Sequence, residues 1–288
     1  MTYFAALIFG ILQGATELFP VSSLGHSVLL PWIARWHIDQ HDPLFLTFLV
    51  LTHTATALVL FGFFGRDWLR IIRGMGISLR ERVVAADNPD GKLGWLLVVA
   101  TVPAGVLGLL FEEALKNLFA APGIVALVLV LNGLMLLAAD ALRRKKVALP
   151  PTSPLESDRR LATLTWRQTI TVGLLQCIAL LPGFSRTGAT IAGGLLADLS
   201  YEDAARFSFL LATPIIGAAS VLKLPELLTT TNTQFFLGPM LIGALAAGGT
   251  AYLSVRWLLH YFETQTLRPF GLYCCAVGLV VLASFALL

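Results

Sequence analysis

The sequence contains few charged residues. Only 13% of its 288 residues are Asp, Glu, Lys or Arg, whereas 57% are hydrophobic, and the mean hydropathy is +0.80. Soluble domains carry about 25% charged residues, so this composition excludes an ordinary soluble protein. The net charge is only +3, and the Lys and Arg residues cluster between apolar runs rather than along one face. Nucleic acid is therefore not expected as a partner.

Cysteine is also scarce, and an N-terminal basic segment is absent. Cys177, Cys274 and Cys275 are too few and too poorly spaced for a disulfide framework, and we expect all three to be buried packing residues. None of the first 30 residues is Lys or Arg, so the basic region of a cleavable signal peptide is missing. The N-terminal apolar run is therefore expected to stay in the mature protein.

No pair of histidines has the spacing of metal ligands. His37, His41 and His260 fall in loops or at the ends of apolar runs. His53 lies within an apolar run, where it faces either a cavity or a neighbouring helix; a structural role is the favoured interpretation. Asn132, inside another run, carries little information by itself. The sequence predicts no zinc site.

Long apolar runs make up most of the chain. A bilayer core needs about 20 apolar residues for each helix that crosses it. Six runs reach this length or nearly so, namely 44–64, 94–111, 121–142, 206–225, 236–260 and 269–288. The expected fold is therefore an all-α polytopic membrane protein with about six transmembrane helices.

Two further regions, 2–36 and 168–199, are each broken in the middle. Each consists of two short apolar runs separated by a cluster of Pro, Ser and Gly. The runs are 2–18 with 24–36 and 168–181 with 188–199. Such halves are too short to cross a bilayer comfortably, and non-helical backbone at membrane depth is tolerated only inside protein or a wet cavity. We expect two re-entrant helical hairpins.

The order hairpin, span, span, span occurs twice along the chain. Since each copy crosses the membrane an odd number of times, the copies form an inverted-topology repeat, which places a binding site where the broken helices meet. The first repeat covers residues 1–148. Residues 149–288 contain a linker, from Leu149 to Ser157, followed by the second repeat. Both repeats belong to a single membrane domain. The breaks share a Gln, Pro, Ser, Gly frame, although chance similarity is the alternative.

The distribution of Lys and Arg predicts the orientation. These residues concentrate in the loops 65–93 and 143–167, which are therefore expected to be cytoplasmic. The segments 37–43 and 226–236 contain none, and 112–120 contains one, which places them outside. Both termini are then expected on the outer side, with the first hairpin entering from the outer face and the second from the cytoplasmic face.

The first break carries a constellation suited to nucleophilic chemistry. Gln13 and Glu17 share a helix face, and an ionised carboxylate in hydrocarbon costs at least ~2.5–3.5 kcal/mol. Glu17 is therefore functional, or it either extends to the membrane surface or is held neutral in a packing contact. Ser22 and Ser23 open the next short helix, whose free N–H groups favour an anion, and His26 follows one turn later. A hydroxyl, a carboxylate and an imidazole are the components of an activated nucleophile. The alternative is that the serines cap the helix and the histidine is structural.

The second break carries an arginine in place of the acid. Arg186 opens a short helix with hydroxyls beside it at Ser185, Thr187 and Thr190. A guanidinium is always charged and matches phosphate oxygens with two parallel hydrogen bonds, so Arg186 beside a helix N-terminus predicts an oxyanion site. The alternative is an ion pair with Glu17. Both interpretations can hold, in the empty and the occupied states.

These motifs resemble the signature of a known family. Gln-x-x-x-Glu with Pro-x-Ser-Ser-x-Gly-His, followed by Pro-Gly-Phe-Ser-Arg-Thr-Gly-Ala-Thr, is similar to the paired motifs of undecaprenyl pyrophosphate phosphatases, over essentially the whole chain. The resemblance implies removal of the terminal phosphate from a C55 polyprenyl pyrophosphate lipid, recycling of the carrier of cell-wall synthesis, and bacitracin resistance. It also implies a bacterial inner-membrane location and a site that faces the outer side.

By motif position, the resemblance also implies the site residues. The catalytic ones would be Glu17, Ser23, His26 and Arg186, and the phosphate-binding ones Gln13, Ser22, Ser185, Thr187 and Thr190. The family's first acidic position is Gln13 here, which leaves Glu17 as the single carboxylate. A divalent cation, Mg²⁺ or Ca²⁺, is implied, with no organic cofactor. With Glu17 as the one protein carboxylate available to it, the ion would bind mostly through the pyrophosphate.

The mechanism we hypothesise uses both hairpins. Arg186 and the two helix N-termini hold the pyrophosphate, Ser23 or His26 attacks or activates water, and Glu17 orients His26 or takes a proton. The alternative is a transporter or flippase of a polyprenyl phosphate lipid without hydrolysis, whereas a purely structural subunit leaves Glu17 and Arg186 unexplained. The sequence leaves open whether the chain forms a homodimer.

Overall fold

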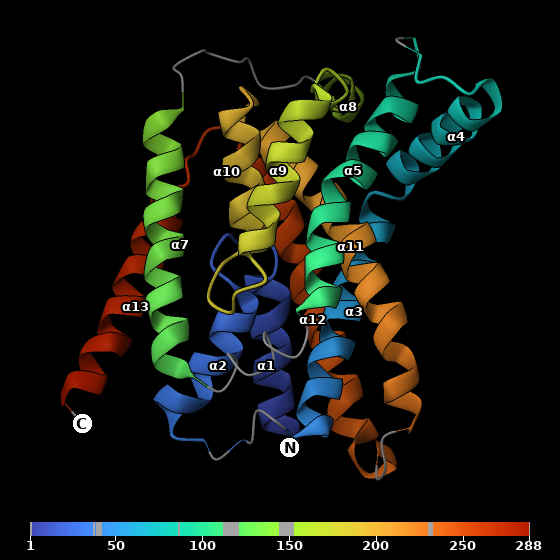
Figure 1. Cartoon of the computed structure of the whole chain (residues 1–288). Helices are drawn as coiled ribbons and strands as arrows, with labels where there is room; N and C mark the ends of the chain where they lie inside the picture. The colour runs from blue at the N-terminus through green and yellow to red at the C-terminus, as the bar shows by residue number, and fades with distance from the viewer. Residues whose placement is uncertain are drawn as a thin grey trace.

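The chain folds as a bundle of helices. The computed structural model describes residues 2–36, 38, 42–85, 87–111, 121–143, 153–229 and 233–287. Within these ranges it contains twelve helices and no strand. The helices stand side by side, and both ends of the chain lie at the same end of the bundle (Figure 1).

Six of the helices are long and apolar enough to cross a membrane. They are α3 (Pro43–Phe63), α5 (Pro89–Leu110), α7 (Pro122–Leu142), α11 (Tyr201–Thr229), α12 (Thr233–Tyr261) and α13 (Arg268–Leu287). Proline occupies the first turn of α3, α5 and α7, where its missing N–H is not needed. The prediction of an all-α polytopic membrane protein with six spans is confirmed.

The two broken regions form two pairs of short helices. They are α1 (Tyr3–Thr16) with α2 (Ser23–Ala34), and α9 (Trp166–Ile178) with α10 (Arg186–Leu196). The first pair occupies the lower half of the bundle and the second the upper half, and their turns meet near mid-height (Figure 1). This arrangement is consistent with two re-entrant hairpins that enter from opposite sides.

Small residues let α1 approach the bundle closely. A Cβ atom on Gly14 would overlap with the carbonyl oxygen of Ala247 and with Thr250 Oγ1, and one on Gly10 would overlap with the backbone of Gly243. Glycines four residues apart allow such close packing between membrane helices. The contact with α12 fixes the position of α1, and with it the position of Glu17 at the end of that helix.

Two helices lie in regions that the sequence assigned to loops. α4 (Gly65–Glu81) falls within 65–93, and α8 (Pro154–Leu161) within 143–167. α4 buries Asp67 and Ile71, whereas Leu69 and Ile72 are exposed beside several arginines. Its hydrophobicity is too low for a span, so a search for long apolar runs misses it. The predicted linker is shorter than expected, because α8 begins at Pro154.

Several sequence predictions concern residues outside the described ranges. These are His37, His41, the outer segment 112–120, the basic residues 144–146 and the linker positions 149–152. The cysteines are described, and all three are free. Cys274 is buried, but Cys177 and Cys275 are only half-buried, so the expectation that all three are buried was wrong for two of them.

A buried ion network joins α4, α8 and α11 at the basic end of the bundle. Arg206 Nε donates to Asp158 Oδ1 at 2.8 Å, and Arg206 Nη2 lies 2.9 Å from Asp67 Oδ2. Arg70 also pairs with Asp158. Burial raises the pKa of the Asp158 carboxyl, and the hydrogen bond from Arg206 opposes this effect. Since removing one partner of such a pair costs about 3–5 kcal/mol, the network fixes α8 against the bundle.

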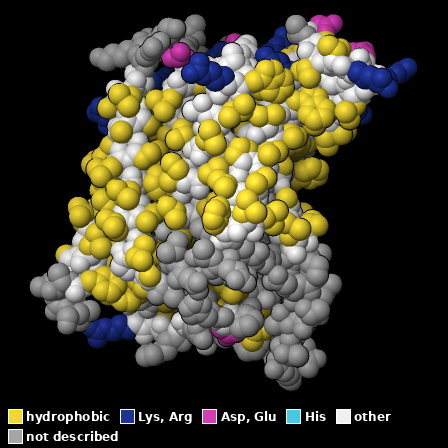
Figure 2. Space-filling view, in the orientation of Figure 1, with side chains coloured by type: hydrophobic (Ala, Val, Ile, Leu, Met, Phe, Trp, Pro, Cys, Tyr) yellow, Lys and Arg dark blue, Asp and Glu magenta, His cyan; other side chains and the backbone are white. Residues whose placement is uncertain are grey.

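The surface has the polarity of a membrane protein. Hydrophobic side chains cover the middle of the face in Figure 2, and Lys and Arg gather mainly at its upper end. That end carries α4 and α8 and lies opposite the two termini (Figure 1). The basic segments and the termini are therefore at opposite ends, as the sequence predicts.

Candidate active site

The turn of the first hairpin places Glu17 and Ser23 together. Glu17 directly follows α1, and Ser23 is the first residue of α2. Ser22 caps α2, because its Oγ accepts a hydrogen bond from Gly25 N at 3.1 Å. Its φ of 69° lies in the left-handed region, which costs a residue other than glycine about 1–3 kcal/mol and is typical of functional sites.

The turn of the second hairpin has the same construction. Ser185 caps α10, and its Oγ accepts a hydrogen bond from Gly188 N at 3.0 Å. Arg186 is the first residue of α10, the position that Ser23 has in α2. The resemblance between the two breaks therefore extends to their capping geometry. The first residue of each short helix reaches the same partner, Glu17.

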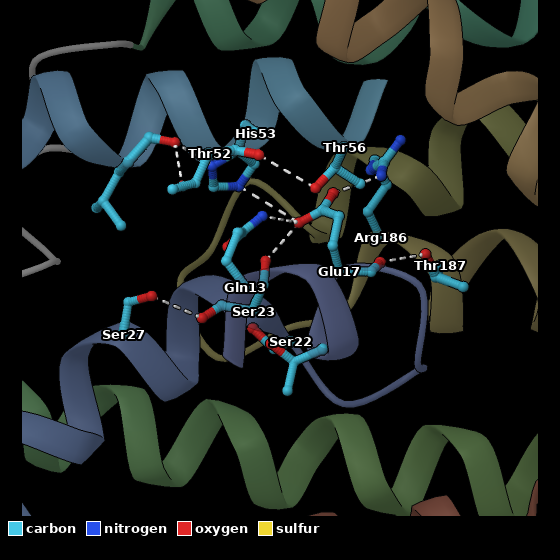
Figure 3. A network of polar contacts seen from close by, with 12 residues as sticks. Gln13, Glu17, Ser22, Ser23, Ser27, Thr52, His53, Thr56, Arg186 and Thr187 are labelled. Carbon is cyan, nitrogen blue, oxygen red and sulfur yellow. Dashed lines mark hydrogen bonds and ion pairs between the residues drawn. The ribbon is translucent and has the colours of Figure 1, made fainter. Parts of the chain in front are cut away.

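Glu17 is the centre of the cluster in Figure 3. Its Oε1 accepts a hydrogen bond from Arg186 Nη2 at 2.6 Å, and its Oε2 accepts one from Ser23 Oγ at 2.5 Å. Gln13 Nε2 also donates to Oε2, at 3.1 Å, and His53 Nε2 lies 3.3 Å from the same oxygen. Four side chains from three parts of the chain thus converge on one carboxylate.

The two members of the Glu17–Arg186 ion pair differ in exposure. Glu17 is buried, whereas the Arg186 side chain is 17% exposed. The guanidinium satisfies the buried carboxylate, and it is also the member of the pair that a ligand can reach. The ion pair with Glu17, the alternative interpretation of Arg186, is therefore present in the structure. A phosphate that arrives at the helix N-termini would compete with Glu17 for Arg186.

The predicted phosphate-binding hydroxyls contact protein groups in this structure. Thr187 Oγ1 donates to the carbonyl oxygen of Glu17 at 2.9 Å. Thr190 Oγ1 donates to the carbonyl oxygen of Arg186 at 2.9 Å and lies 2.6 Å from Ser208 Oγ. These bonds connect the second hairpin to the first and to α11. A direct contact of either threonine with phosphate stays a prediction.

His26 is oriented away from Glu17. Its Nδ1 lies 2.7 Å from the carbonyl oxygen of Ser22, and its Nε2 lies 2.8 Å from Tyr273 Oη on α13. A carbonyl oxygen only accepts hydrogen bonds, so Nδ1 carries a proton, and Nε2 of a neutral ring accepts from the tyrosine. The expectation that Glu17 orients His26 was wrong for this structure, because Tyr273 holds the ring instead.

Asn132 is a site residue that sequence reasoning undervalued. It is fully buried in α7. Its Oδ1 accepts a hydrogen bond from Ser185 N at 3.0 Å, and its Nδ2 donates to the carbonyl oxygen of Pro20 at 3.1 Å. One amide side chain therefore joins the turns of both hairpins. The signal in the sequence was a lone amide in a span, which is costly without partners.

We expect Asn132→Leu to lower both stability and activity. The substitution leaves the buried Ser185 N–H without its partner, at about 1–3 kcal/mol, and leaves the Pro20 carbonyl oxygen with only the weak donor Cys274 Sγ. Thermal unfolding in detergent should show a lower midpoint temperature. Turnover should also fall, because Asn132 no longer holds the two turns in position relative to each other. Leu131→Ala is the control, since Leu131 is 48% exposed on the same helix. A midpoint for Asn132→Leu equal to that of the control would contradict this role.

The site residues do not form a resident metal centre by themselves. No group of three or more His, Cys, Asp or Glu side chains within the described residues could hold a metal ion. Both oxygens of Glu17 accept from donors of the protein. Gln13 Oε1, in contrast, is buried without a hydrogen-bond partner, so it is an oxygen whose acceptor capacity the protein leaves unused.

Comparisons with known proteins identify the family of this chain. A family model described as bacitracin resistance protein BacA matches residues 6–280. The chain is 45% identical over 303 residues to an undecaprenyl-diphosphatase of Mycolicibacterium paratuberculosis, covering 100% of this chain and 98% of the relative. It is 44% identical over 283 residues to undecaprenyl-diphosphatase 2 of Chromobacterium violaceum, covering 97% and 98% of the two chains. The chain belongs to the family of the bacitracin resistance protein BacA.

Proposed function

We propose that this membrane protein hydrolyses undecaprenyl diphosphate to undecaprenyl phosphate and inorganic phosphate, and so recycles a lipid carrier of cell-wall synthesis and confers bacitracin resistance. The relatives are named for this reaction. The observation that carries the proposal is the contact of Ser23 Oγ with Glu17 Oε2 at 2.5 Å, while Arg186 contacts the other oxygen. A hydroxyl nucleophile, its base and a phosphate-binding cation are thus within one cluster.

The helix N-termini give the pyrophosphate its binding site. Ser23 and Arg186 are the first residues of α2 and α10, and both side chains reach Glu17, so the N-terminal ends of the two helices converge. Backbone N–H groups and the helix dipole favour an anion at such ends. The terminal phosphate then lies between Ser23 and Arg186, and the guanidinium exchanges Glu17 for phosphate oxygens.

Ser23 is the nucleophile in this mechanism. Its Oγ bonds to the terminal phosphorus, its proton passes to Glu17 Oε2, and the bond from phosphorus to the bridging oxygen breaks, so that undecaprenyl phosphate leaves with the electron pair. Water then attacks the phosphoserine, Glu17 returns its proton to Ser23 Oγ, and both water protons leave with inorganic phosphate. His26, whose ring contacts Ser22 and Tyr273, positions the turn that carries Ser23.

The divalent cation is assigned to the substrate. Mg²⁺ is commonly held by substrate phosphates with only one or two protein ligands. The unpartnered Gln13 Oε1 is a protein oxygen suited to such an ion, and Glu17 Oε2 stays engaged by Ser23. A bound cation would neutralise charge on the pyrophosphate.

Phosphate release by the purified protein tests the proposed function directly. Protein in liposomes is supplied with undecaprenyl diphosphate and Mg²⁺, and inorganic phosphate is measured against protein-free liposomes. Stoichiometric release of phosphate with undecaprenyl phosphate is the expected result. Movement of the intact lipid between leaflets without phosphate release would instead support the alternative, a polyprenyl phosphate transporter.

Arg186→Lys should lower kcat/KM by about 10²- to 10³-fold, the usual loss when one donor to a transition-state oxyanion is removed. Lysine keeps the charge but not the two-pronged phosphate contact. Steady-state phosphate release measures the effect. Arg167→Lys is the matched control, because Arg167 is exposed in the first turn of α9. Near-normal turnover of Arg186→Lys would remove Arg186 from the phosphate site.

The membrane orientation completes the proposal. Basic residues prefer the cytoplasmic side, so the end of α4 and α8 faces the cytoplasm, and both termini and the approach to the first hairpin face outward. The two halves then form an inverted repeat in the bacterial inner membrane. The matching serine caps of α2 and α10, Ser22 and Ser185, support that relationship.

Site-specific labelling tests this orientation. In a cysteine-free variant, a cysteine at Arg35, the exposed end of α2, should react with an impermeant maleimide in intact spheroplasts. A cysteine at Arg82, the exposed end of α4, should react only after permeabilisation. The reverse pattern would invert the protein in the membrane.

A further inference from the structure

Of the four side chains that converge on the Glu17 carboxylate, His53 is the one that the mechanism above leaves unused. It lies in α3, and its side chain is 19% exposed. Its ring spans two oxygen atoms: Nδ1 lies 2.7 Å from the carbonyl oxygen of Leu49, and Nε2 lies 3.3 Å from Glu17 Oε2. Figure 3 shows the ring above the carboxylate, on the side opposite Ser23.

The geometry determines the protonation state of this ring. The Leu49 carbonyl oxygen can only accept a hydrogen bond, so Nδ1 carries a proton. Glu17 Oε1 accepts a hydrogen bond from Arg186 Nη2 at 2.6 Å, and the permanent charge of the guanidinium keeps the carboxylate ionised. An unprotonated Nε2 would direct its lone pair at the ionised Oε2, 3.3 Å away, so a second proton is needed on Nε2. Both nitrogens of His53 are donors, which makes the ring an imidazolium.

We propose that His53 is a positioning residue that acts through Glu17: as an imidazolium it holds the carboxylate toward Ser23 when Arg186 leaves for the phosphate. The proposal rests on the proposed function. The Arg186 guanidinium pairs with Glu17 in this structure, and in the proposed mechanism it binds the phosphate instead. Without a second cation, Glu17 would become a buried, unpaired charge at that moment, which is strongly unfavourable.

The two carboxylate oxygens of Glu17 have different partners. Oε1 faces Arg186, whereas Oε2 faces both Ser23 and His53. Departure of the guanidinium thus frees Oε1 only, and His53 keeps Oε2 beside the hydroxyl. No covalent bond forms or breaks at His53.

Activity should depend on the charge of His53. The charged groups that face it are Glu17, at the end of α1, and Arg186, at the start of α10. α11 and α12 also pack on α3. Their residues at this height are uncharged: Ser220 bonds to Thr54, and Gly248 lies near Ala55 and Val59. When His53 loses its proton, an Nε2 lone pair faces the carboxylate, so kcat should fall as the pH rises.

Two variants separate charge from shape. His53→Gln keeps an uncharged amide donor, and His53→Leu keeps bulk without a donor. We expect His53→Leu to lower kcat by about 100-fold with KM nearly unchanged, as misplaced catalytic groups do. His53→Gln should retain about a tenth of kcat, the modest loss expected for a neutral donor, and should lose the fall in rate at high pH. His260→Gln is the control, since that side chain is 82% exposed and should leave rate and pH profile unchanged.

A spectroscopic measurement tests the same proposal without turnover. Protein labelled with ¹⁵N-histidine contains five histidines, and the signal lost in His53→Gln identifies His53. This signal should have the imidazolium shift at neutral pH and should titrate at lower pH in Glu17→Gln. A neutral ring at neutral pH, or a His53→Gln enzyme with wild-type kcat and alkaline limb, would overturn the proposal. Absence of phosphate release by the wild-type protein would instead refute the proposed function and leave the spectroscopic result standing.

Discussion

Ser23→Ala is expected to reduce kcat by about 10³-fold or more, because the variant has no hydroxyl to attack phosphorus. The fold should survive, since the Ser23 side chain makes its hydrogen bond to Glu17 and the α2 cap is Ser22. The measurement is steady-state release of phosphate from undecaprenyl diphosphate, with folding checked by gel filtration and thermal unfolding.

Ser22→Ala provides the comparison for this prediction. Ser22 lies next to Ser23, and its Oγ accepts from Gly25 N, so its loss should cost about 1 kcal/mol of stability and much less activity. A trapped phosphoserine, found at residue 23 by mass spectrometry after acid quench, would identify the nucleophile independently. Equal activity losses in the two variants would mean that both hydroxyls act on phosphate, and full activity in Ser23→Ala would exclude Ser23.

The spans could be predicted from the sequence because their signal is local. A run of about 20 apolar residues has few alternatives to a membrane helix, and all six predicted runs coincide with long helices. The breaks were equally local, since Pro, Ser and Gly interrupt helices at the residues where α2 and α10 begin. α4 was missed because its exposed face mixes Leu69 and Ile72 with arginines, so no apolar run marks it.

The composition of the site was predictable, but its internal contacts were not. Chemistry alone singled out Glu17, Ser23 and Arg186, because each is costly or reactive at membrane depth. His53 and Asn132 lie 36 and 115 residues beyond Glu17 in the sequence, and their contacts arise from helix packing. A single sequence cannot show which face of α3 or α7 points at the hairpins. For the same reason Tyr273, the partner of His26, gave no signal.

The site depends on both halves of the chain. Glu17 and Ser23 come from the first hairpin and Arg186 from the second, and Asn132 joins the two turns. Neither half contains the proposed nucleophile, base and phosphate-binding cation together. Catalysis therefore requires the two halves to pack against each other, and changes at this contact should affect kcat before they affect the individual helices.

Glu17→Gln decides whether the carboxylate is a base or only a partner for Arg186. We expect the variant to fold, because the amide has nearly the same shape and its oxygen still accepts a hydrogen bond. It takes no proton, however, so Ser23 loses its base, and kcat should fall by about 10³-fold, within the range that general bases contribute. Steady-state rates at saturating substrate measure this change, with thermal unfolding as the check on the fold.

The division between kcat and KM tells the two roles apart. If Glu17 served only to hold Arg186, the amide would release the guanidinium more easily, and kcat would stay near its wild-type value while KM changed. If Glu17 is the base, KM should change little, because the substrate contacts Arg186 and the helix N-termini in both proteins. A wild-type kcat in Glu17→Gln would therefore show that Glu17 does not accept the proton of Ser23. Arg186 and the helix dipoles alone would then have to activate Ser23, by stabilising its alkoxide.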